Sequence, residues 1–267
     1  MKQHTKTLGQ VFLHDQNIIN KIITLANPKP NMPIIEIGCG KGILTQALAH
    51  IGPVNVIEID ERWINHVADL NLKNVTFTHK DALSVDYSTL PKHAPVIANI
   101  PYQITSPLIE TLAKYKHHLG PITIMIQKDV ADRLLSPKNS KTYGSMTIFC
   151  NYHFTITKGF NVSRHCFSPE PNVDSSVIQL QAKKNVFSKS DTPLFFAMTR
   201  SFFWGRRKTM LNCLINSPHI HCDENIKNNN ALKQLLKKRG ESLSLEEHQS
   251  LFTTIKPYIT LSKKCSE

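Results

Sequence analysis

The sequence lacks long hydrophobic runs and closely spaced pairs of cysteines. No apolar stretch approaches the roughly 18 residues of a membrane span, so we expect no membrane segment. The six cysteines are scattered, with no Cys-x-x-Cys pair, at positions 39, 150, 166, 213, 222 and 265. This pattern argues against a zinc ribbon or a disulfide framework and favours free thiols in a reducing cytoplasm. The polar start, Met1 to Lys6, has no apolar segment behind it, so we expect no secretion signal either.

Acidic residues are few compared with basic ones. The chain has 20 Asp and Glu against 32 Lys and Arg, which gives a formal net charge of +12 at pH 7. Residues 1–183 carry 18 basic and 13 acidic groups, whereas residues 184–267 carry 14 and 7. A surface this basic favours a polyanionic partner, and a nucleic acid is the obvious one. The alternative is a solvated face with no partner.

Short apolar segments alternate with amphipathic ones over most of the chain, which predicts an α/β fold with a largely parallel sheet. The 267 residues, 40% of them hydrophobic, suffice for one large domain and one small domain. We expect strands at residues 33–37, 54–59, 75–78, 95–98, 122–126, 146–157 and 176–181, with helices between them. After residue 184 the pattern becomes purely helical, with expected helices at 194–204 and 231–239. The predicted domains are therefore residues 1–183 and a small all-helical domain at residues 184–267.

Three features at successive expected strand ends point to a bound nucleoside. The turn Gly38-Cys-Gly-Lys-Gly42 lets a ligand approach backbone N–H groups at a helix start, but it is not the Gly-x-Gly-x-x-Gly of dinucleotide enzymes. Glu58 lies about 20 residues further on, where an acid can hold ribose hydroxyls. Asp81 follows the next strand and can accept a hydrogen bond from an adenine amino group. Each acid alone is equally compatible with a helix N-cap, but the three together favour a nucleoside site.

Asn99, Ile100, Pro101 and Tyr102 follow the buried segment at 95–98, where active sites of open α/β sheets lie. The N6 amine of adenine is a poor nucleophile because its lone pair is delocalised into the ring, so it needs orientation more than a base. The Asn99 side-chain oxygen and the Ile100 carbonyl can accept its two N–H bonds, and Pro101 favours an extended Ile100. Tyr102 offers a ring for base stacking. Alone, the tetrapeptide is also compatible with a plain strand end closed by a Pro-Tyr turn.

Two further segments complete the predicted site. The proline-stiffened loop 167–175 begins with Phe167, which we expect to face Tyr102 and grip a base that has left its stack. Arg206, Arg207 and Lys208 are three cations in a row, for which an RNA backbone contact is favoured over a solvated face. We expect no metal site, because the polar segment 219–222 has no second ligand cluster. Together these features describe a class I S-adenosylmethionine methyltransferase that acts on an amine.

With these motifs the chain resembles the ribosomal RNA adenine N6,N6-dimethyltransferase family over nearly its whole length. The matching segments are Leu8-Gly-Gln-Val-Phe-Leu13, Glu36-Ile-Gly-Cys-Gly40, Asn99-Ile-Pro-Tyr102 and Phe167-x-Pro-x-Pro-x-Val-x-Ser175. The resemblance implies contacts with S-adenosylmethionine at Val11, Leu13, Gly38, Glu58, Asp81 and Asn99. Val11 replaces the family's usual Asn, so a contact there must use its backbone or its packing surface.

The resemblance also implies a substrate. One branch of the family dimethylates two adjacent adenines near the 3′ end of small-subunit (16S) ribosomal RNA, and the other modifies large-subunit RNA and confers antibiotic resistance. Asn99-Ile-Pro-Tyr102 and Gly40-Lys-Gly42 lean slightly toward the second branch. The first branch is favoured by Lys141-Thr-Tyr-Gly144, Arg206-Arg-Lys-Thr-x-x-Asn212 and Arg239-Gly-Glu-Ser-Leu243, which cover more of the chain. We therefore expect a cytoplasmic, monomeric enzyme of late small-subunit assembly whose partner is the pre-30S particle. A relative that binds RNA without methylating it is the remaining alternative.

Overall fold

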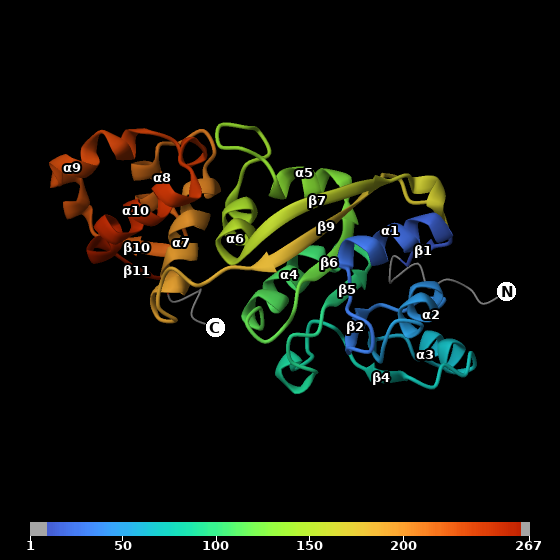
Figure 1. Ribbon diagram of the computed structural model, residues 1–267. Helices are drawn as coiled ribbons and strands as arrows, with labels where there is room; N and C mark the ends of the chain where they lie inside the picture. Colours follow the sequence, from blue (N-terminus) through green and yellow to red (C-terminus); the bar gives the residue numbers. More distant parts are fainter. Residues whose placement is uncertain (1–9, 263–267) are drawn as a thin grey trace. The chain divides into compact units, whose positions relative to one another are not determined.

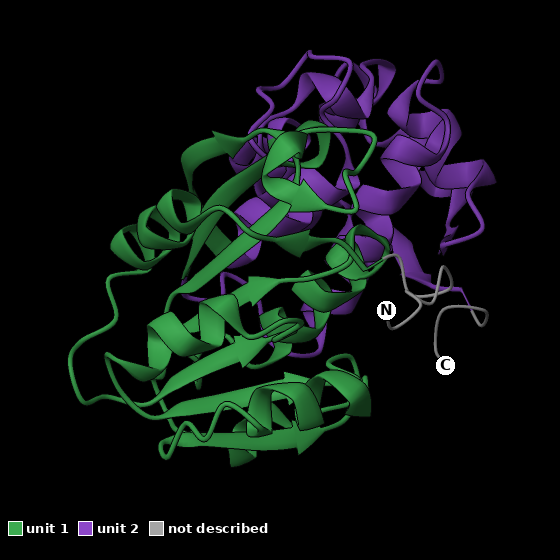
Figure 2. Ribbon diagram, turned by 90° about the vertical axis from the view of Figure 1, so that its right-hand side faces the viewer, with its two compact units in different colours: residues 1–131, 154–182 green, residues 132–153, 183–267 purple. Residues whose placement is uncertain are grey.

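The computed structural model describes residues 10–262 (Figure 1). Leu8 and Gly9 of the lead-in motif lie outside the described residues. The chain divides into two compact units, residues 1–131 with 154–182 and residues 132–153 with 183–267 (Figure 2). The second unit thus includes residues 132–153, which the sequence-based division places in the first domain. No helix among the described residues is both long and apolar enough to cross a membrane.

A seven-stranded sheet with the order β4-β3-β2-β5-β6-β9-β7 forms the centre of the first unit. Its strands are β2 (Ile34–Ile37), β3 (Val54–Glu58), β4 (Val75–His79), β5 (Val96–Asn99), β6 (Ile122–Gln127), β7 (Phe154–Val162) and β9 (Ser175–Ala182). β2 pairs in parallel with both β3 and β5, while β9 runs antiparallel to β6 and β7. The strand order therefore reverses beside β2, and open α/β sheets bind ligands at the carboxyl ends of strands at such a point.

Helices cover both faces of this sheet. α1 (Gln16–Ala26), α2 (Ile43–Ala49) and α3 (Glu61–Ala68) lie on one side and α4 (Thr105–Lys114) on the other (Figure 1). The first three bury apolar side chains against the sheet in one hydrophobic cluster. Asp15 is the N-cap of α1, and its carboxylate accepts hydrogen bonds from the backbone N–H groups of Asn17 and Ile18. Two short strands, β1 (Phe12–Leu13) and β8 (Phe167–Ser168), pair separately from the main sheet.

The predicted strand at residues 146–157 is wrong over most of its length. Residues Ser145–His153 form helix α6, and β7 begins only at Phe154. α6 belongs to the second unit, where the buried Tyr152 ring lies 5.3 Å from the ring of Phe195. The segment is apolar without strict alternation, so its packing partner decides between helix and strand. The other expected strands of the sheet are confirmed to within two residues.

The second unit is not all-helical, which corrects the prediction. Strands β10 (Ile220–Cys222) and β11 (Ile259–Leu261) pair antiparallel within it. Its helices are α6, α7 (Asp191–Trp204), α8 (Met210–Asn216), α9 (Asn230–Lys233) and α10 (Leu245–Ile255), and α5 (Lys128–Leu134) crosses into it from the first unit. The predicted helix 231–239 ends at Lys233 and is followed by a 3-10 turn at Leu235–Lys237. After this turn the Lys238 carbonyl accepts a bond from the Met210 N–H (2.8 Å).

Candidate active site

A pocket of about 320 Å³ opens in the first unit at the carboxyl ends of four neighbouring strands. Gly38 follows β2, Glu58 ends β3, Asp81 follows β4, and Asn99 ends β5; all four line this pocket. Val11 and Leu13, from the lead-in, line it as well. The structure therefore brings together every described residue for which the sequence predicted a cofactor contact.

Gly38, the first residue after β2, brings the glycine turn into contact with the end of β5. Its φ of +80° is strained for a residue with a side chain, and a Cβ placed there would lie 3.1 Å from the Asn99 carbonyl oxygen. The Gly38 N–H donates to the Ile57 carbonyl at 2.9 Å, which also ties the turn to β3. Because Gly38 has no side chain, the glycine turn and Asn99 can share one wall of the pocket.

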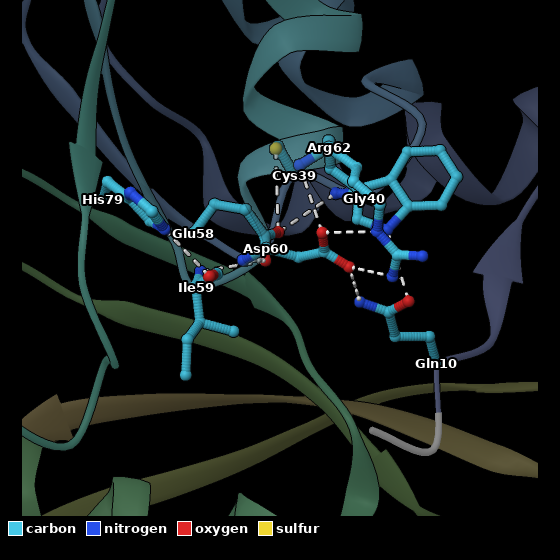
Figure 3. A network of polar contacts seen from close by, with 9 residues as sticks. Gln10, Cys39, Gly40, Glu58, Ile59, Asp60, Arg62 and His79 are labelled. Atoms are coloured by element: carbon cyan, nitrogen blue, oxygen red, sulfur yellow. Dashed lines mark hydrogen bonds and ion pairs between the residues drawn. The ribbon is translucent and has the colours of Figure 1, made fainter. Parts of the chain in front are cut away.

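Backbone N–H groups hold the Glu58 carboxylate in place (Figure 3). One oxygen, Oε1, accepts from the N–H groups of Ile59 (2.9 Å) and Asp60 (3.0 Å). The other, Oε2, accepts from the Gly40 N–H at 3.4 Å and from the Cys39 thiol at 3.7 Å. Burial, together with the nearby carboxylates, raises the pKa of that thiol, so Cys39 stays protonated. Glu58 is thus fixed at the pocket wall, and the two long contacts of Oε2, at 3.4 and 3.7 Å, are the ones that a ligand's hydroxyl group can replace.

Asp60 was not predicted from the sequence, although it lies two residues beyond Glu58. Its side chain caps α3 and forms an ion pair with Arg62 at 2.6 Å (Figure 3). The hydrogen bonds from Arg62 lower the pKa of Asp60 to about 2. Gln10, also missed, donates to Asp60 at 3.2 Å and accepts from the indole N–H of Trp63 at 3.2 Å. Gln10 thereby fastens the lead-in segment to the wall of the pocket.

The lead-in segment closes one side of the pocket with apolar side chains. Leu13 is buried and packs in the cluster under α1, while Val11 is half-buried and packs against the same cluster. Lys41, in the glycine turn, places its ammonium 5.2 Å from the centroid of the Phe12 ring. A Cβ at Gly40 would lie 2.9 Å from that ring, so the turn and the lead-in are in close contact.

The Asp81 carboxylate is exposed at the mouth of the pocket. One oxygen accepts from the Leu83 N–H at 2.9 Å, which orients the group and leaves the second oxygen for a ligand. Asn99 is half-buried and lines the same pocket, with Ile100 and Pro101 next to it. A carboxylate after β4 and an amide at the end of β5, with β3 and β2 between these strands, can each hold an amino group.

Tyr102 and Phe167, which the sequence analysis expected to face each other, have different surroundings in the structure. The Tyr102 hydroxyl shares a 2.7 Å hydrogen bond with the buried hydroxyl of Ser175. Phe167 is 4% exposed, pairs with Leu13 in the β1–β8 ladder and packs in the cluster under α1. Tyr102, the last residue of the segment Asn99–Tyr102, is therefore fixed through its hydroxyl group, whereas the ring of Phe167 is part of the hydrophobic core.

The predicted RNA contacts lie in the second unit, between α7 and α8. Arg206, Arg207 and Lys208 are exposed, and Arg206 pairs with Glu241 at 3.1 Å. His221 and Cys222 lie in strand β10 rather than in the polar loop we expected. Within the part of the chain that the structure describes, no group of three or more His, Cys, Asp or Glu residues is arranged to hold a metal ion.

A parallel sheet that reverses its order beside β2, with a glycine turn after that strand and a pocket at the reversal, defines the class I methyltransferase fold. The crystal structure of the 23S rRNA methyltransferase ErmE has this fold, with a TM-score of 0.68 at 22% identity over 92% of this chain and 99% of that one. The fold class predicted from the sequence is thereby confirmed.

Comparison with known proteins narrows the class to one family. The family model for ribosomal RNA adenine dimethylase matches residues 1–250. Ribosomal RNA small subunit methyltransferase A from Streptococcus thermophilus is 36% identical over 264 residues, covering 92% of this chain and 90% of that protein. Its counterpart from Bacillus licheniformis is 37% identical over 256 residues, covering 91% and 88%. A dimethyladenosine transferase structure from Plasmodium falciparum matches with a TM-score of 0.76 at 28% identity, covering 92% and 98%. The chain belongs to the ribosomal RNA adenine dimethylase family.

Proposed function

We propose that this protein transfers methyl groups from S-adenosylmethionine to the N6 amines of two adjacent adenines near the 3′ end of small-subunit ribosomal RNA. The observation that carries the proposal is the position of Asn99 at the end of β5. It packs against the Gly38 turn and faces the same pocket as Glu58 and Asp81. An amine held by Asn99 is therefore next to a site suited to a nucleoside cofactor.

The choice of the small subunit rests on the relatives. The proteins from Streptococcus thermophilus and Bacillus licheniformis are named as small subunit methyltransferases and match nearly the full chain. Large-subunit modification remains an alternative, but the likeness to ErmE, at 22% identity, supports the fold alone. We further propose that the enzyme acts on an assembling small-subunit particle, because its basic charge is concentrated after residue 184 and suits a polyanionic partner. We propose that it does so as a monomer.

The residues of the pocket fit S-adenosylmethionine. Glu58 would hold the ribose hydroxyls through Oε2, whose contacts with the Gly40 N–H and the Cys39 thiol are long, while the N–H groups of Ile59 and Asp60 fix Oε1. Asp81 would accept from the adenine amino group, and the half-buried Val11 would pack against the ligand rather than bond to it. When bound, the cofactor supplies an electrophilic methyl group carried on a sulfonium.

Asn99 and Ile100 orient the acceptor. The side-chain oxygen of Asn99 and the backbone carbonyl of Ile100 accept the two N–H bonds of the adenine amine, which directs its nitrogen toward the methyl donor. The proton can leave to water after methylation, so no strong base is needed. A monomethylated amine still has one N–H for Asn99 or Ile100, and the same pocket can therefore add the second methyl group.

Replacement of Asn99 tests this mechanism. We expect Asn99→Ala to abolish methyl transfer while RNA affinity stays nearly intact, with a smaller loss of cofactor affinity. The measurement is mass spectrometry of nucleosides from small-subunit particles incubated with enzyme and S-adenosylmethionine. Asn185→Ala, at an exposed asparagine of the second unit, is the matched control and should retain activity. Substantial dimethyladenine from Asn99→Ala, or a product methylated on a ring nitrogen or the ribose, would contradict the proposal.

A further inference from the structure

The C-terminal end of α7 exposes a large aromatic ring. Trp204, the last residue of the helix, is 47% exposed, although the preceding residues of α7 are largely buried. The other tryptophan of the chain, Trp63, packs against Phe12 with ring centroids 4.7 Å apart and donates its indole N–H to Gln10. Trp63 thus packs and forms its hydrogen bond within the protein, whereas much of the Trp204 side chain faces solvent.

Lys208 folds back over one face of this ring. Its ammonium lies 4.7 Å from the ring centroid of Trp204, within cation–π range. A tight turn produces this geometry, because the Lys208 N–H donates to the Gly205 carbonyl at 2.7 Å. A Cβ at Gly205 would lie 3.0 Å from Cδ of Lys208, so the absence of a side chain there makes room for the lysine stem. The turn therefore places a cation and an aromatic ring side by side at the surface.

A second cationic segment lies next to this turn. The Lys238 carbonyl accepts from the Met210 N–H at 2.8 Å, and a Cβ at Gly240 would lie 2.6 Å from Cβ of Phe202. These contacts hold the segment 237–239 against the end of α7 and the start of α8. All three of its residues are exposed cations, Lys237, Lys238 and Arg239. The turn at residues 205–208 and the segment 237–239 thus bring two groups of cations, distant in the sequence, to the same end of α7 as Trp204.

We propose that Trp204 is a stacking platform for an unpaired base of the RNA, with the cations of residues 206–208 and 237–239 binding the flanking phosphates. This inference rests on the proposed function, which makes RNA the substrate. An exposed aromatic ring alone would fit a protein partner equally well. Two groups of cations at the same end of α7 as the ring favour a polyanion that also carries flat aromatic groups, and single-stranded RNA has both. Lys208 covers one ring face, so a base stacks on the other.

Fluorescence and binding measurements with the full-length protein test the proposal. The chain has two tryptophans, so the difference between the wild type and Trp204→Phe isolates the emission of Trp204. The probes are a short single-stranded oligoadenylate and an abasic oligoribonucleotide of the same length. We expect the oligoadenylate to quench Trp204 and the abasic strand to leave it nearly unchanged, because only the first can stack.

The affinities of the Trp204 variants should likewise differ for the oligoadenylate but not for the abasic strand. Trp204→Ala should weaken oligoadenylate binding about 5- to 100-fold, the range for loss of one stacked base, while Trp204→Phe retains most of the affinity. Neither substitution should change the affinity for the abasic strand, which is held by the cations. Val186→Ala, at a residue of the second unit that is 58% exposed, is the matched control for loss of an exposed apolar group.

Equal oligoadenylate affinity for the wild type and Trp204→Ala, or no quenching of Trp204, would overturn the proposal. A loss of affinity for ribosomal particles alone, with oligoadenylate binding unchanged, would also overturn it, because the ring would then contact a protein. Methyl transfer measured in parallel separates this inference from the proposed function. If the wild type fails to methylate small-subunit particles but its Trp204 is still quenched by oligoadenylate, the proposed function fails and the stacking platform stands.

Discussion

Glu36, in the middle of β2, should make the stability of the protein depend on pH. Its side chain is completely buried, and neither carboxyl oxygen has a hydrogen-bond partner among the described residues. Burial raises the pKa of Glu36 from its ordinary value of 4.5 to about 8, and the negative charge of Glu58 adds to the effect. The hydroxyl of Thr45 lies near enough to offset part of this rise but not in the geometry of a full hydrogen bond.

The direction of the effect follows from the two states of the chain. In the folded protein Glu36 stays neutral up to about pH 8, whereas in the unfolded chain it ionises above its ordinary value of 4.5. The stability that it contributes is therefore fully present below pH 4.5 and is lost as the pH rises to about 8. At about 1.4 kcal/mol for each pH unit, the loss across this window is about 5 kcal/mol.

Glu36→Gln removes the titrating group and should remove this loss. The unfolding free energy of the variant, relative to the wild type, should increase by about 5 kcal/mol between pH 4.5 and pH 8. Urea unfolding in a Trp204→Phe background reports on the first unit through Trp63, the remaining tryptophan. Taking the difference between the two proteins cancels the other titrating groups, including His248 in the second unit, whose burial lowers its pKa to about 4.

Two further variants make the result decisive. Glu61→Gln, at an exposed position in the first turn of α3, should leave the pH dependence as it is in the wild type. Glu36→Met removes the charge without adding an amide, so it serves if the buried Gln side chain prevents folding. Parallel unfolding curves for wild type and Glu36 variants from pH 4.5 to pH 8 would refute the reasoning, because Glu36 would then be ionised in the folded protein.

Three more predictions concern the site and the basic surface. Glu58→Gln and Asp81→Ala should each weaken S-adenosylmethionine binding by roughly 1–3 kcal/mol in calorimetry, and unchanged affinity in both folded variants would remove the assignment. Tyr102→Ala should strongly reduce methyl transfer. Tyr102→Phe should keep much of the activity, because the ring remains and only the 2.7 Å hydrogen bond to Ser175 is removed. Equal activities of the two variants would contradict a stacking role. Replacing Arg206, Arg207 and Lys208 with Ala should flatten the salt dependence of RNA binding by about 0.7–0.9 slope units for each phosphate that the variant no longer binds. The control Lys189→Ala should keep the wild-type slope, and an unaltered slope in the triple variant would mean that the three cations only face solvent.

The sequence predicted the sheet well because its strands carry their own signals. Most of the parallel strands are short apolar runs, and Gly38, Glu58, Asp81 and Asn99 lie at the ends of four of them or just beyond, so the strands and the pocket could be inferred, whereas the strand order was not predicted. The helix α6 could not, because its apolar residues satisfy either pattern until packing partners in the second unit, such as Phe195, are known. The same holds for β10 and β11, which are three residues each and stabilise one another only as a pair.

The residues that the sequence analysis missed act through contacts with distant segments. Gln10 belongs to the recognised lead-in motif, but its bonds to Asp60 and Trp63 join positions 50 and 53 residues apart. Patterns within a short stretch of sequence cannot predict hydrogen bonds between residues this far apart in the chain. These bonds of Gln10 also bear on Val11, whose side chain has no hydrogen-bonding group. Because the adjacent Gln10 is bonded to Asp60 and Trp63, the position of the lead-in beside the pocket does not depend on a polar side chain at Val11.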